Sequence, residues 1–456
     1  MTISWAETRP AGDANKNWRG VASDSDGSNL IAADFGGRLW TSDDSGVSWT
    51  ERRPVGDVNK DWLCVASDSD GSHLIAGIYG GRLYTSANSG VDWTERQPAG
   101  NSNENWRGVA SDSDGSNLIA VTFGDKYYLS DDYGVSWTTK GTGTWQSTAS
   151  DSDGSNLILG SATRLYTSAN FGVDWTQRQP AGDVNKDWEC IASDADGSNL
   201  LAGANSKRLY TSANSGVDWT ERQPAGAVDI NWFSGASDSD GSNLIVGASS
   251  GRLYVSIDSG ANWTEERPAG DASKQWICVA SNSDGSRLIA GAYADRLYIT
   301  VSLPGKPTNP SPTDTASSIT LDETPLSWDA SNPAADTYEV YFRKSGDAWG
   351  LVGVAQAGVS WAVSFGTLAY GTTYEWRIDA TNDAGPTTGD TWSFDTISFD
   401  QPRISYRLIS GGNGRGPYDS PPGVQGTDWE YTGENNMLTV RKLVVAANDK
   451  IWHESI

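Results

Sequence analysis

The sequence predicts an all-β protein, and three observations carry this prediction. An Asp-Gly pair recurs at intervals of 44, 44, 39, 43, 44 and 44 residues, at Asp26, Asp70, Asp114, Asp153, Asp196, Asp240 and Asp284. Each unit contains four short apolar or aromatic runs separated by turn residues, such as WLCVA, HLIAGIY, RLYTS and VDWTE, which are typical of strands and hairpins. The seventh unit lacks its fourth run, and ISWAETRPAG near the N-terminus copies VSWTERRPVG of the first unit.

Together these observations predict a seven-bladed β-propeller over residues 1–303. Four antiparallel strands in about 44 residues match one propeller blade. The N-terminal strand is expected to complete the seventh blade and close the ring, because closure removes exposed sheet edges.

Composition and charge argue against several classes of function. The 456 residues carry a net charge of −25, whereas a nucleic-acid partner requires a basic face. No run of 18 apolar residues is present, so membrane insertion is not expected. The opening MTISWAETRP has neither the basic start nor the apolar stretch of a cleaved signal peptide. His73 and His453 are the only histidines, which disfavours His-rich zinc sites and Ser-His-Asp triads.

The segment SDDSGVSW, residues 42–49, resembles the Asp-box or BNR repeat, whose pattern is S/T-x-D-x-G-x-T/S-W. Five further copies end at Trp93, Trp137, Trp175, Trp219 and Trp263, with Asn88, Asn170 and Asn214 in place of the Asp. Asp-box propellers include sialidases, xyloglucanases, sorting receptors, photosystem assembly factors and lectins, so the resemblance implies the fold and leaves the function open. We expect the repeated Asp or Asn, Gly and Trp to build the turn.

A calcium site at the Asp-x-Asp-Gly turns is an alternative to a simple hairpin turn. These turns lack the additional carboxylates and the distal Glu of a calcium loop, so the hairpin is the favoured interpretation. No other metal or cofactor is expected.

Residues 317–397 resemble a fibronectin type III domain, an immunoglobulin-like β-sandwich. The resemblance rests on PLSWDAS with Trp328, on TYEVYFRKSG, and on Tyr374 as a tyrosine-corner residue. Residues 304–316, rich in Pro, Ser and Thr, are predicted to be a linker. Residues 398–456 are predicted to be a small β-rich element with two strands around Asn448-Asp449. This element would dock to other virion or cell-surface proteins, or mediate oligomerisation.

Residues that recur in every unit are interpreted as architecture. A basic residue opens the third strand of all seven units, which argues against an arginine triad of the sialidase kind: Arg38, Arg82, Lys126, Arg164, Arg208, Arg252 and Arg296. Cys64, Cys190 and Cys278 share one position in units that are never neighbours, so we expect no disulfide within the ring.

Positions that vary between units are better candidates for binding. The turn between the second and third strands carries an aromatic residue in the first, second, third and seventh units, which are consecutive once the ring is closed. These residues are Phe35, Tyr79, Phe123 and Tyr293. Ala162, Asn205 and Ser249 replace them in the other three units. Exposed rings beside polar loops suit sugar faces, and the alternative is that these rings pack between blades.

A second variable set follows the first Trp of each unit: Arg19, Leu63, Arg107, Gln146, Glu189, Phe233 and Ile277. We expect this set near the central channel. It offers two arginines and one glutamate as candidate ligand-binding residues, Arg19, Arg107 and Glu189, and this combination indicates an anionic group as the ligand. No catalytic residue is predicted.

The sequence therefore predicts a non-enzymatic binding and display protein that holds a polysaccharide or host-surface glycan. An extracellular type of domain pair without a signal peptide indicates a phage virion component (tail fibre, tailspike or capsid decoration) or a surface adhesin, located on a virion or extracellular surface. One alternative is a glycoside hydrolase of the sialidase-like propeller type, which needs two carboxylates about 5–10 Å apart, with Asp187 and Glu189 as candidates. The other alternative is a purely structural virion spacer.

Overall fold

The protein is all-β, and its contacts divide it into two units, Met1–Ser302 and Leu303–Ile456. The computed structural model describes residues 3–398 except 125, 183, 206–207, 250, 302–303, 322–324, 332–334, 364–367 and 383–384, together with four short strands beyond residue 398. Among these residues there is no helix of the length and apolarity that a membrane crossing requires.

The first unit is built from repeated four-stranded antiparallel sheets. The first strands are β2 (Trp18–Ser23), β6 (Lys60–Ser67), β10 (Glu104–Ser111), β14 (Trp145–Ser150), β18 (Trp188–Ser193), β22 (Trp232–Ser237) and β26 (Trp276–Ser281). The second strands are β3 (Leu30–Gly37), β7 (Leu74–Gly81), β11 (Leu118–Thr122), β15 (Leu157–Ser161), β19 (Leu200–Ala204), β23 (Leu244–Ala248) and β27 (Leu288–Ala292).

The third strands are β4 (Leu39–Ser42), β8 (Leu83–Ser86), β12 (Tyr127–Ser130), β16 (Leu165–Ser168), β20 (Leu209–Ser212), β24 (Leu253–Ser256) and β28 (Leu297–Val301). The fourth strands are β5 (Thr50–Arg52), β9 (Thr94–Arg96), β13 (Thr138–Lys140), β17 (Thr176–Arg178), β21 (Thr220–Arg222) and β25 (Thr264–Glu266). β1 (Ser4–Thr8) pairs antiparallel with β28, from Ser4↔Val301 to Thr8↔Leu297, and is the fourth strand of the sheet that contains β26.

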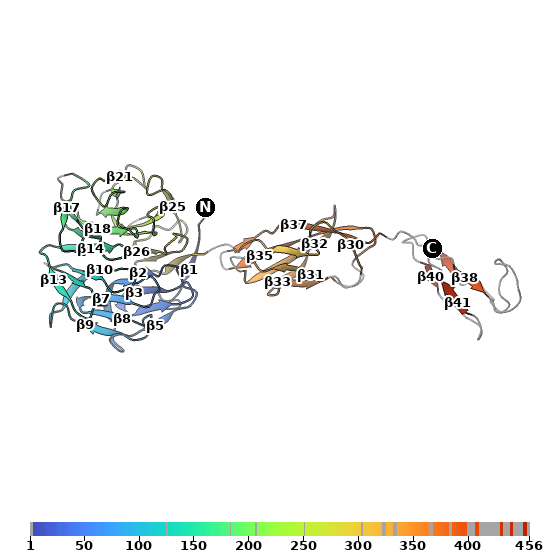
Figure 1. Cartoon of the computed structure of the whole chain (residues 1–456), viewed down its shortest axis with the longest axis horizontal. Coiled ribbons are helices and arrows are strands. Elements are labelled where there is room, and N and C mark those ends of the chain that lie inside the picture. The colour runs from blue at the N-terminus through green and yellow to red at the C-terminus, as the bar shows by residue number, and fades with distance from the viewer. Residues whose placement is uncertain are drawn as a thin grey trace. The chain divides into compact units, whose positions relative to one another are not determined.

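The first strands lie at the centre of this unit, and the fourth strands lie at its rim (Figure 1). Each first strand contacts the next one along the chain, and β26 contacts β2. Apolar side chains of neighbouring sheets share a core, as where Ile31 and Leu39 pack with Trp62. The same kind of core joins the last sheet to the first, through Trp18 and Leu297. Burial of such large side chains from water is the main source of stability for these interfaces.

The Asp-Gly turns are linked to one another by backbone hydrogen bonds. The amide of Ser25 donates to the carbonyl of Ser69 (2.9 Å), and equivalent bonds of 2.8 to 3.0 Å continue through Ser69, Ser113, Ser152, Ala195 and Ser239 to Ser283. Within each turn, the aspartates accept hydrogen bonds from the turn itself. Asp24, for example, accepts from Asn29 Nδ2 (2.6 Å), and Asp26 accepts from the amide of Ser28 (2.8 Å).

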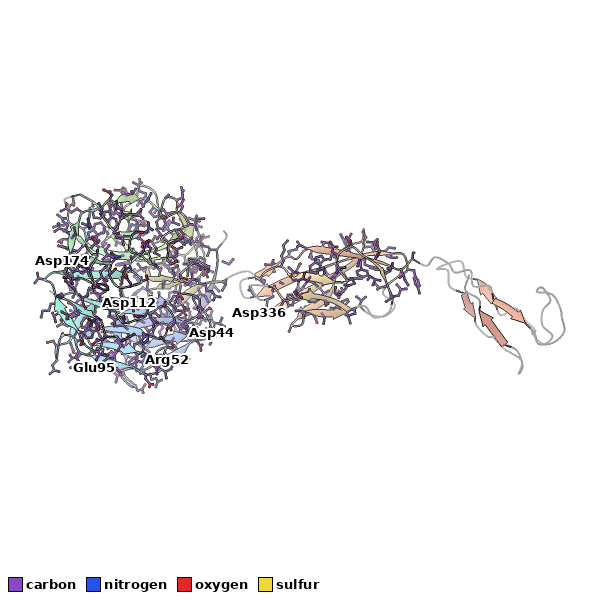
Figure 2. The ribbon with its side chains drawn as sticks, in the orientation of Figure 1. Asp44, Arg52, Glu95, Asp112, Asp174 and Asp336 are labelled. Carbon is purple, nitrogen blue, oxygen red and sulfur yellow. The ribbon has the colours of Figure 1, made fainter. Side chains whose placement is uncertain are left out.

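The turn between the third and fourth strands is held by hydrogen bonds from the repeated Asp or Asn and Trp, as expected for residues that build the turn. The carboxylate of Asp44, labelled in Figure 2, accepts from the amide of Ser48 (2.8 Å), and Trp49 Nε1 donates to the carbonyl of Gly46 (3.0 Å). Gly46 has φ of +87°, a conformation that glycine adopts without steric cost. Asn88 accepts the same amide hydrogen bond in the next unit, from Asp92 (2.8 Å), so Asp and Asn are equivalent at this position.

The basic residue that opens the third strand fastens the loop leading to the next sheet. Arg38 Nη1 donates to the carbonyls of Gly56 and Val58, both at 2.7 Å. Equivalent bonds to loop carbonyls are made by Arg82, Arg208, Arg252 and Arg296. The architectural interpretation of these arginines is therefore confirmed. The three cysteines are buried and free, as expected.

The second unit contains two sheets around one core. One sheet contains β29 (Thr308–Ser311), β31 (Pro325–Asp329) and β34 (Ser360–Ala362). The other contains β30 (Ala316–Ile319), β37 (Thr391–Thr396), β35 (Thr373–Asn382), β32 (Thr337–Lys344) and β33 (Gly350–Gln356), with β36 (Gly385–Thr387) paired to β35. Trp328 packs edge-on against Tyr338, with ring centroids 5.5 Å apart, and Tyr374 Oη accepts a hydrogen bond from the amide of Ala369 (2.9 Å).

The segment predicted as a linker, residues 304–316, contains β29 and so contributes to the first of these sheets. β29 pairs with β31, and Asn309 Nδ2 donates to Asp329 (2.7 Å). Its Pro-rich composition is compatible with a strand at the edge of a sheet, because on the outer side of an edge strand a proline that lacks an N–H costs no hydrogen bond to a neighbouring strand.

The described residues of the C-terminal segment form four short strands. β38 (Tyr406–Ile409) pairs with β41 (Lys450–His453), and β39 (Trp429–Tyr431) pairs with β40 (Leu438–Val440). The described parts of the two strands predicted around Asn448-Asp449, β40 and β41, thus pair with the earlier strands β39 and β38, while Asn448-Asp449 itself lies outside the described residues.

Candidate functional site

The four aromatic residues predicted at the turn between second and third strands are partly exposed. Phe123 and Tyr293 follow directly after β11 and β27, whereas Phe35 and Tyr79 lie within the ends of β3 and β7 and not in a turn. Tyr79, Phe123 and Tyr293 expose 40%, 45% and 42% of their surfaces, and Phe35 is half-buried. The rings of Phe35 and Tyr79, from neighbouring sheets, have centroids 6.4 Å apart. We call this set, Phe35, Tyr79, Phe123 and Tyr293, the aromatic arc. Its rings retain surface that can contact a ligand.

Backbone hydrogen bonds position the arc beside the entrance to each first strand. The amide of Phe35 donates to the carbonyl of Asn17, that of Phe123 to Asn105, and that of Tyr293 to Gln275, each at 2.9 Å. These bonds therefore hold the backbones of Phe35, Phe123 and Tyr293 next to the beginnings of β2, β10 and β26.

The first strands surround a central channel, a cavity of ≈ 170 Å³. All seven residues of the second variable set line it: Arg19, Leu63, Arg107, Gln146, Glu189, Phe233 and Ile277. Their alignment follows from the repeat, because each residue stands directly after the first Trp of its unit.

The arc and the channel meet through two arginines. The guanidinium carbon of Arg19 lies 5.6 Å from the ring centroid of Phe35 and 5.0 Å from that of Tyr293. The guanidinium of Arg107 lies 5.0 Å from the ring centroid of Phe123. These are cation–π distances, so the two predicted sets form one continuous surface.

Neither arginine has a carboxylate partner among the described residues. Arg107 donates to the neutral side chain of Gln146, from Nε (3.1 Å) and Nη2 (2.7 Å). Nε of Arg19 is buried and makes no hydrogen bond in the described part of the chain. By contrast, nearby Lys16 pairs with Asp34 (3.0 Å), and Lys274 pairs with Asp295 (2.6 Å).

Glu189 lies on the opposite part of the channel wall, on β18. Burial raises the pKa of its carboxyl, the neighbouring Asp187 adds to this rise, and Arg107 opposes it. Its Oε2 is buried and, within the described residues, has no hydrogen-bond partner. The channel thus has a cationic part and an acidic part that do not neutralise each other by direct contact.

Asp34 was not singled out from the sequence, although it is a buried acid at the edge of the arc. Its Oδ1 accepts from the amide of Asn17 (3.1 Å), and its carboxylate pairs with Lys16. A signal was available in the repeat. The equivalent positions, which pair with the first Trp of each unit, hold Ile78, Thr122, Ser161, Ala204, Ala248 and Ala292.

Four further grooves, of ≈ 240 to ≈ 280 Å³, lie between neighbouring sheets and are lined by residues of the Asp-Gly and Asp-box turns. Their lining repeats from unit to unit: Asn156, Leu157 and Arg178 in one groove correspond to Asn199, Leu200 and Arg222 in the next. Grooves that recur with the repeat are explained by the architecture, unlike the channel. In the described part of the chain, no three His, Cys, Asp or Glu side chains are placed to hold a metal ion.

Comparisons with known proteins identify the fold and nothing beyond it. No family model matches the chain, and no curated protein matches its sequence. A solved structure of YCF48 bound to a D1 peptide is similar, with a TM-score of 0.53 and 14% identity over 66% of this chain and 98% of that one. YCF48 from Cyanidioschyzon merolae is similar as well, with a TM-score of 0.52 and 14% identity over 65% of this chain and 98% of that one. YCF48 is a seven-bladed β-propeller, and the repeated four-stranded sheets of this protein match a β-propeller fold.

Proposed function

We propose that the protein is a non-enzymatic carbohydrate-binding and display protein that holds a polysaccharide or surface glycan on the aromatic arc and channel mouth. The observation that carries the proposal is the stacking of Arg19 and Arg107 on partly exposed rings of the arc. Aromatic faces bind the apolar faces of sugars, and guanidinium groups donate hydrogen bonds to sugar oxygens.

The proposed scaffold is a closed seven-bladed propeller of the Asp-box type, in which β1 completes the seventh blade. The β1–β28 pairing, the core that joins Trp18 to Leu297, and the hydrogen bonds between the Asp-Gly turns support closure. The hydrogen bonds of Asp44 and Trp49 support the Asp-box assignment. A closed ring is a rigid support, which lowers the entropy that the binding surface loses when a ligand binds.

The second unit is proposed to be a fibronectin type III domain that spaces the propeller from its attachment. Its two sheets around one core, with the Tyr374 hydroxyl bonded to a nearby amide, support this assignment. Residues 398–456 would attach the protein to other virion or cell-surface proteins. The proposed setting is a phage tail fibre, tailspike or capsid decoration, or a surface adhesin.

A glycan-binding screen on the full chain tests the proposal. Wild type is compared with a variant in which Phe35, Tyr79, Phe123 and Tyr293 are all alanine. The matched control carries Asn205→Ala and Ser249→Ala, at the same positions of units without an aromatic residue. Binding that is lost in the arc variant and retained in the control supports the proposal. No binding to any glycan overturns it and favours a structural spacer.

A glycoside hydrolase is the second candidate, because Glu189 combines a raised pKa with a neighbouring carboxylate, Asp187. Such a pair can supply a general acid and a second carboxylate. Release of reducing sugar from a bound polysaccharide, abolished by Glu189→Gln, would establish hydrolysis. Binding without release of sugar supports the non-enzymatic proposal.

A further inference from the structure

We propose that the ligand is an acidic polysaccharide whose sugar rings carry carboxylates, and that Arg19 and Arg107 bind two of these carboxylates at the mouth of the channel. This inference rests on the proposed carbohydrate-binding function and adds the chemical class of the ligand.

The first argument is the uncompensated charge of the two arginines. The chain has 58 acidic and 33 basic residues, so carboxylates are abundant. Basic side chains near the arc are paired with them, as Lys16 is with Asp34 and Lys274 is with Asp295. Arg19 and Arg107 have no such partner within the described residues. A half-buried charge without a counter-ion is unfavourable, and an anionic ligand would supply the missing partner.

The second argument is the orientation of the guanidinium groups. An aromatic ring lies against Arg107, and Gln146 holds two of its nitrogens, which leaves Nη1 without a protein partner in the described part of the chain. The guanidinium of Arg19 lies against the rings of Phe35 and Tyr293, and only its buried Nε is turned away from a ligand, so its terminal nitrogens are the atoms assigned to the carboxylate. Stacking fixes the plane of a guanidinium while leaving its N–H edge free, and that edge matches the geometry of a carboxylate.

The third argument is the spacing of these groups around the channel. Arg19 stands on β2 and Arg107 on β10, while the strand between them, β6, contributes Leu63 to the channel wall and is followed by Tyr79 in the arc. The surface therefore offers two subsites, each with an arginine beside a ring, on either side of Tyr79. A polymer of acidic sugars presents this alternation of apolar ring face and carboxylate.

The acidic part of the channel limits where such a polymer can lie. Glu189 and Asp187 on the β18 side repel carboxylates, so the polysaccharide is confined to the side of β2, β6 and β10. This side coincides with the arc, because Phe35, Tyr79 and Phe123 follow the same three strands.

The test measures binding of the full chain to polygalacturonate and to the same polymer after complete methyl esterification. Esterification keeps the sugar rings and removes the charge. Alginate, hyaluronate and dextran sulfate extend the acidic panel, and dextran is the neutral reference. We expect wild type to bind at least one carboxylated polymer, and esterification to weaken binding to polygalacturonate or alginate by at least about tenfold, the loss expected from a charge-assisted hydrogen bond.

The variants are Arg19→Gln and Arg107→Gln, with Arg53→Gln as the matched control, since Arg53 is exposed and paired with Glu51. Each channel variant should lose about tenfold in affinity for the acidic polymer and little for the esterified one, whereas Arg53→Gln should keep both. Arg19→Lys, which keeps the charge, should recover part of the loss. Unfolding curves confirm that each variant is folded.

Three outcomes overturn the inference, and they differ in what else they overturn. Equal binding of acidic and esterified polymers, lost in the arc variant, refutes the acidic ligand and leaves carbohydrate binding intact. Preference for dextran sulfate alone refutes the carboxylate. Binding of poly-glutamate through Arg19 and Arg107 with no binding to any polysaccharide identifies a peptide ligand and refutes both proposals.

Discussion

The backbone amide of Ser283 donates a hydrogen bond of 2.9 Å to the carbonyl oxygen of Ser25, which joins the Asp-Gly turn of the last unit to that of the first. The same two units share a core through Trp18 and Leu297. These contacts depend on the last sheet being held in place, and β1 is the strand that completes that sheet.

Deletion of residues 1–8 is therefore expected to lower the melting temperature of the first unit by many degrees. The deletion removes the five-residue pairing with β28 and the packing of Trp5 against the last sheet. Scanning calorimetry of the full chain measures the change. Arg9→Gln is the control, because Arg9 makes exposed ion pairs, which solvent screens, so their loss is expected to leave the melting temperature almost unchanged. An unchanged melting curve for the deletion would refute the role of β1 as the closing strand.

Arg82→Met is expected to destabilise the first unit without affecting ligand binding. Arg82 donates to the carbonyls of Gly100, Asn101 and Ser102, and its loss removes these hydrogen bonds at a cost of about 0.5–1.5 kcal/mol, because the exposed carbonyls can bond to water instead. Chemical denaturation measures the free energy of unfolding. Arg82→Lys should recover part of it. If Arg82→Met reduced glycan binding while leaving stability unchanged, the architectural role would be wrong.

The three cysteines are expected to be unreactive in the folded protein. Burial raises the pKa of the Cys64 and Cys278 thiols to about 12 and also raises that of Cys190, so at pH 8 almost no thiolate is present or accessible. Titration with a thiol-specific chromogenic reagent should give no reaction under native conditions. The three thiols should react in denaturant. Rapid native labelling would show that the channel wall opens.

Binding of a carboxylated polymer is expected to strengthen as the pH falls toward the raised pKa of Glu189. Glu189 and Asp187 both repel the ligand carboxylates. Protonation of Glu189 removes one of these two negative charges, while Arg19 and Arg107 stay charged. The ligand carboxylates must remain ionised, which sets the lower limit of the pH range. Glu189→Gln should bind more tightly at neutral pH and show a flatter pH profile. An identical pH profile in this variant would contradict the proposed repulsion between Glu189 and the ligand carboxylates.

The same carboxyl has an effect on stability with a defined sign. Its pKa is higher in the folded protein than in the unfolded chain, so the folded state binds the proton more tightly. Stability from this group therefore falls as the pH rises through the unfolded and then the folded pKa. Glu189→Gln is expected to melt at a slightly higher temperature than wild type at pH 7 and at an equal temperature at low pH.

The repeat explains why much of the first unit could be predicted. The interval between Asp-Gly pairs, the four apolar runs and the copy of the fourth strand at the N-terminus are local patterns, and each indicates a strand or turn directly. The seven channel-lining residues of the second variable set followed from the same frame, since each stands after the first Trp of its unit. The predicted architectural role of the third-strand arginines followed from the presence of a basic residue at this position in every unit.

What the sequence could not provide was contact between residues distant in the chain. Arg19 and Tyr293 belong to the first and last units, and their stacking depends on how side chains reach across a sheet interface. The aromatic arc and the channel set were thus predicted as two separate surfaces. β29 was predicted as part of a linker because its Pro-rich composition is shared by linkers and by edge strands. Asp34 required a comparison of the same position across all units.

The pairing of β1 with β28 also determines the order in which the molecule can be completed during synthesis. Ser4 leaves the ribosome well before its partner Val301, which emerges after almost the whole first unit has been made. Until then, β1 is an unpaired strand whose sequence closely resembles the fourth strands of the units that follow. Two nascent chains held close together can therefore exchange this strand, as in domain swapping. Refolding at low protein concentration is expected to favour the monomer, because closure within one chain does not depend on concentration, whereas strand exchange between two chains does.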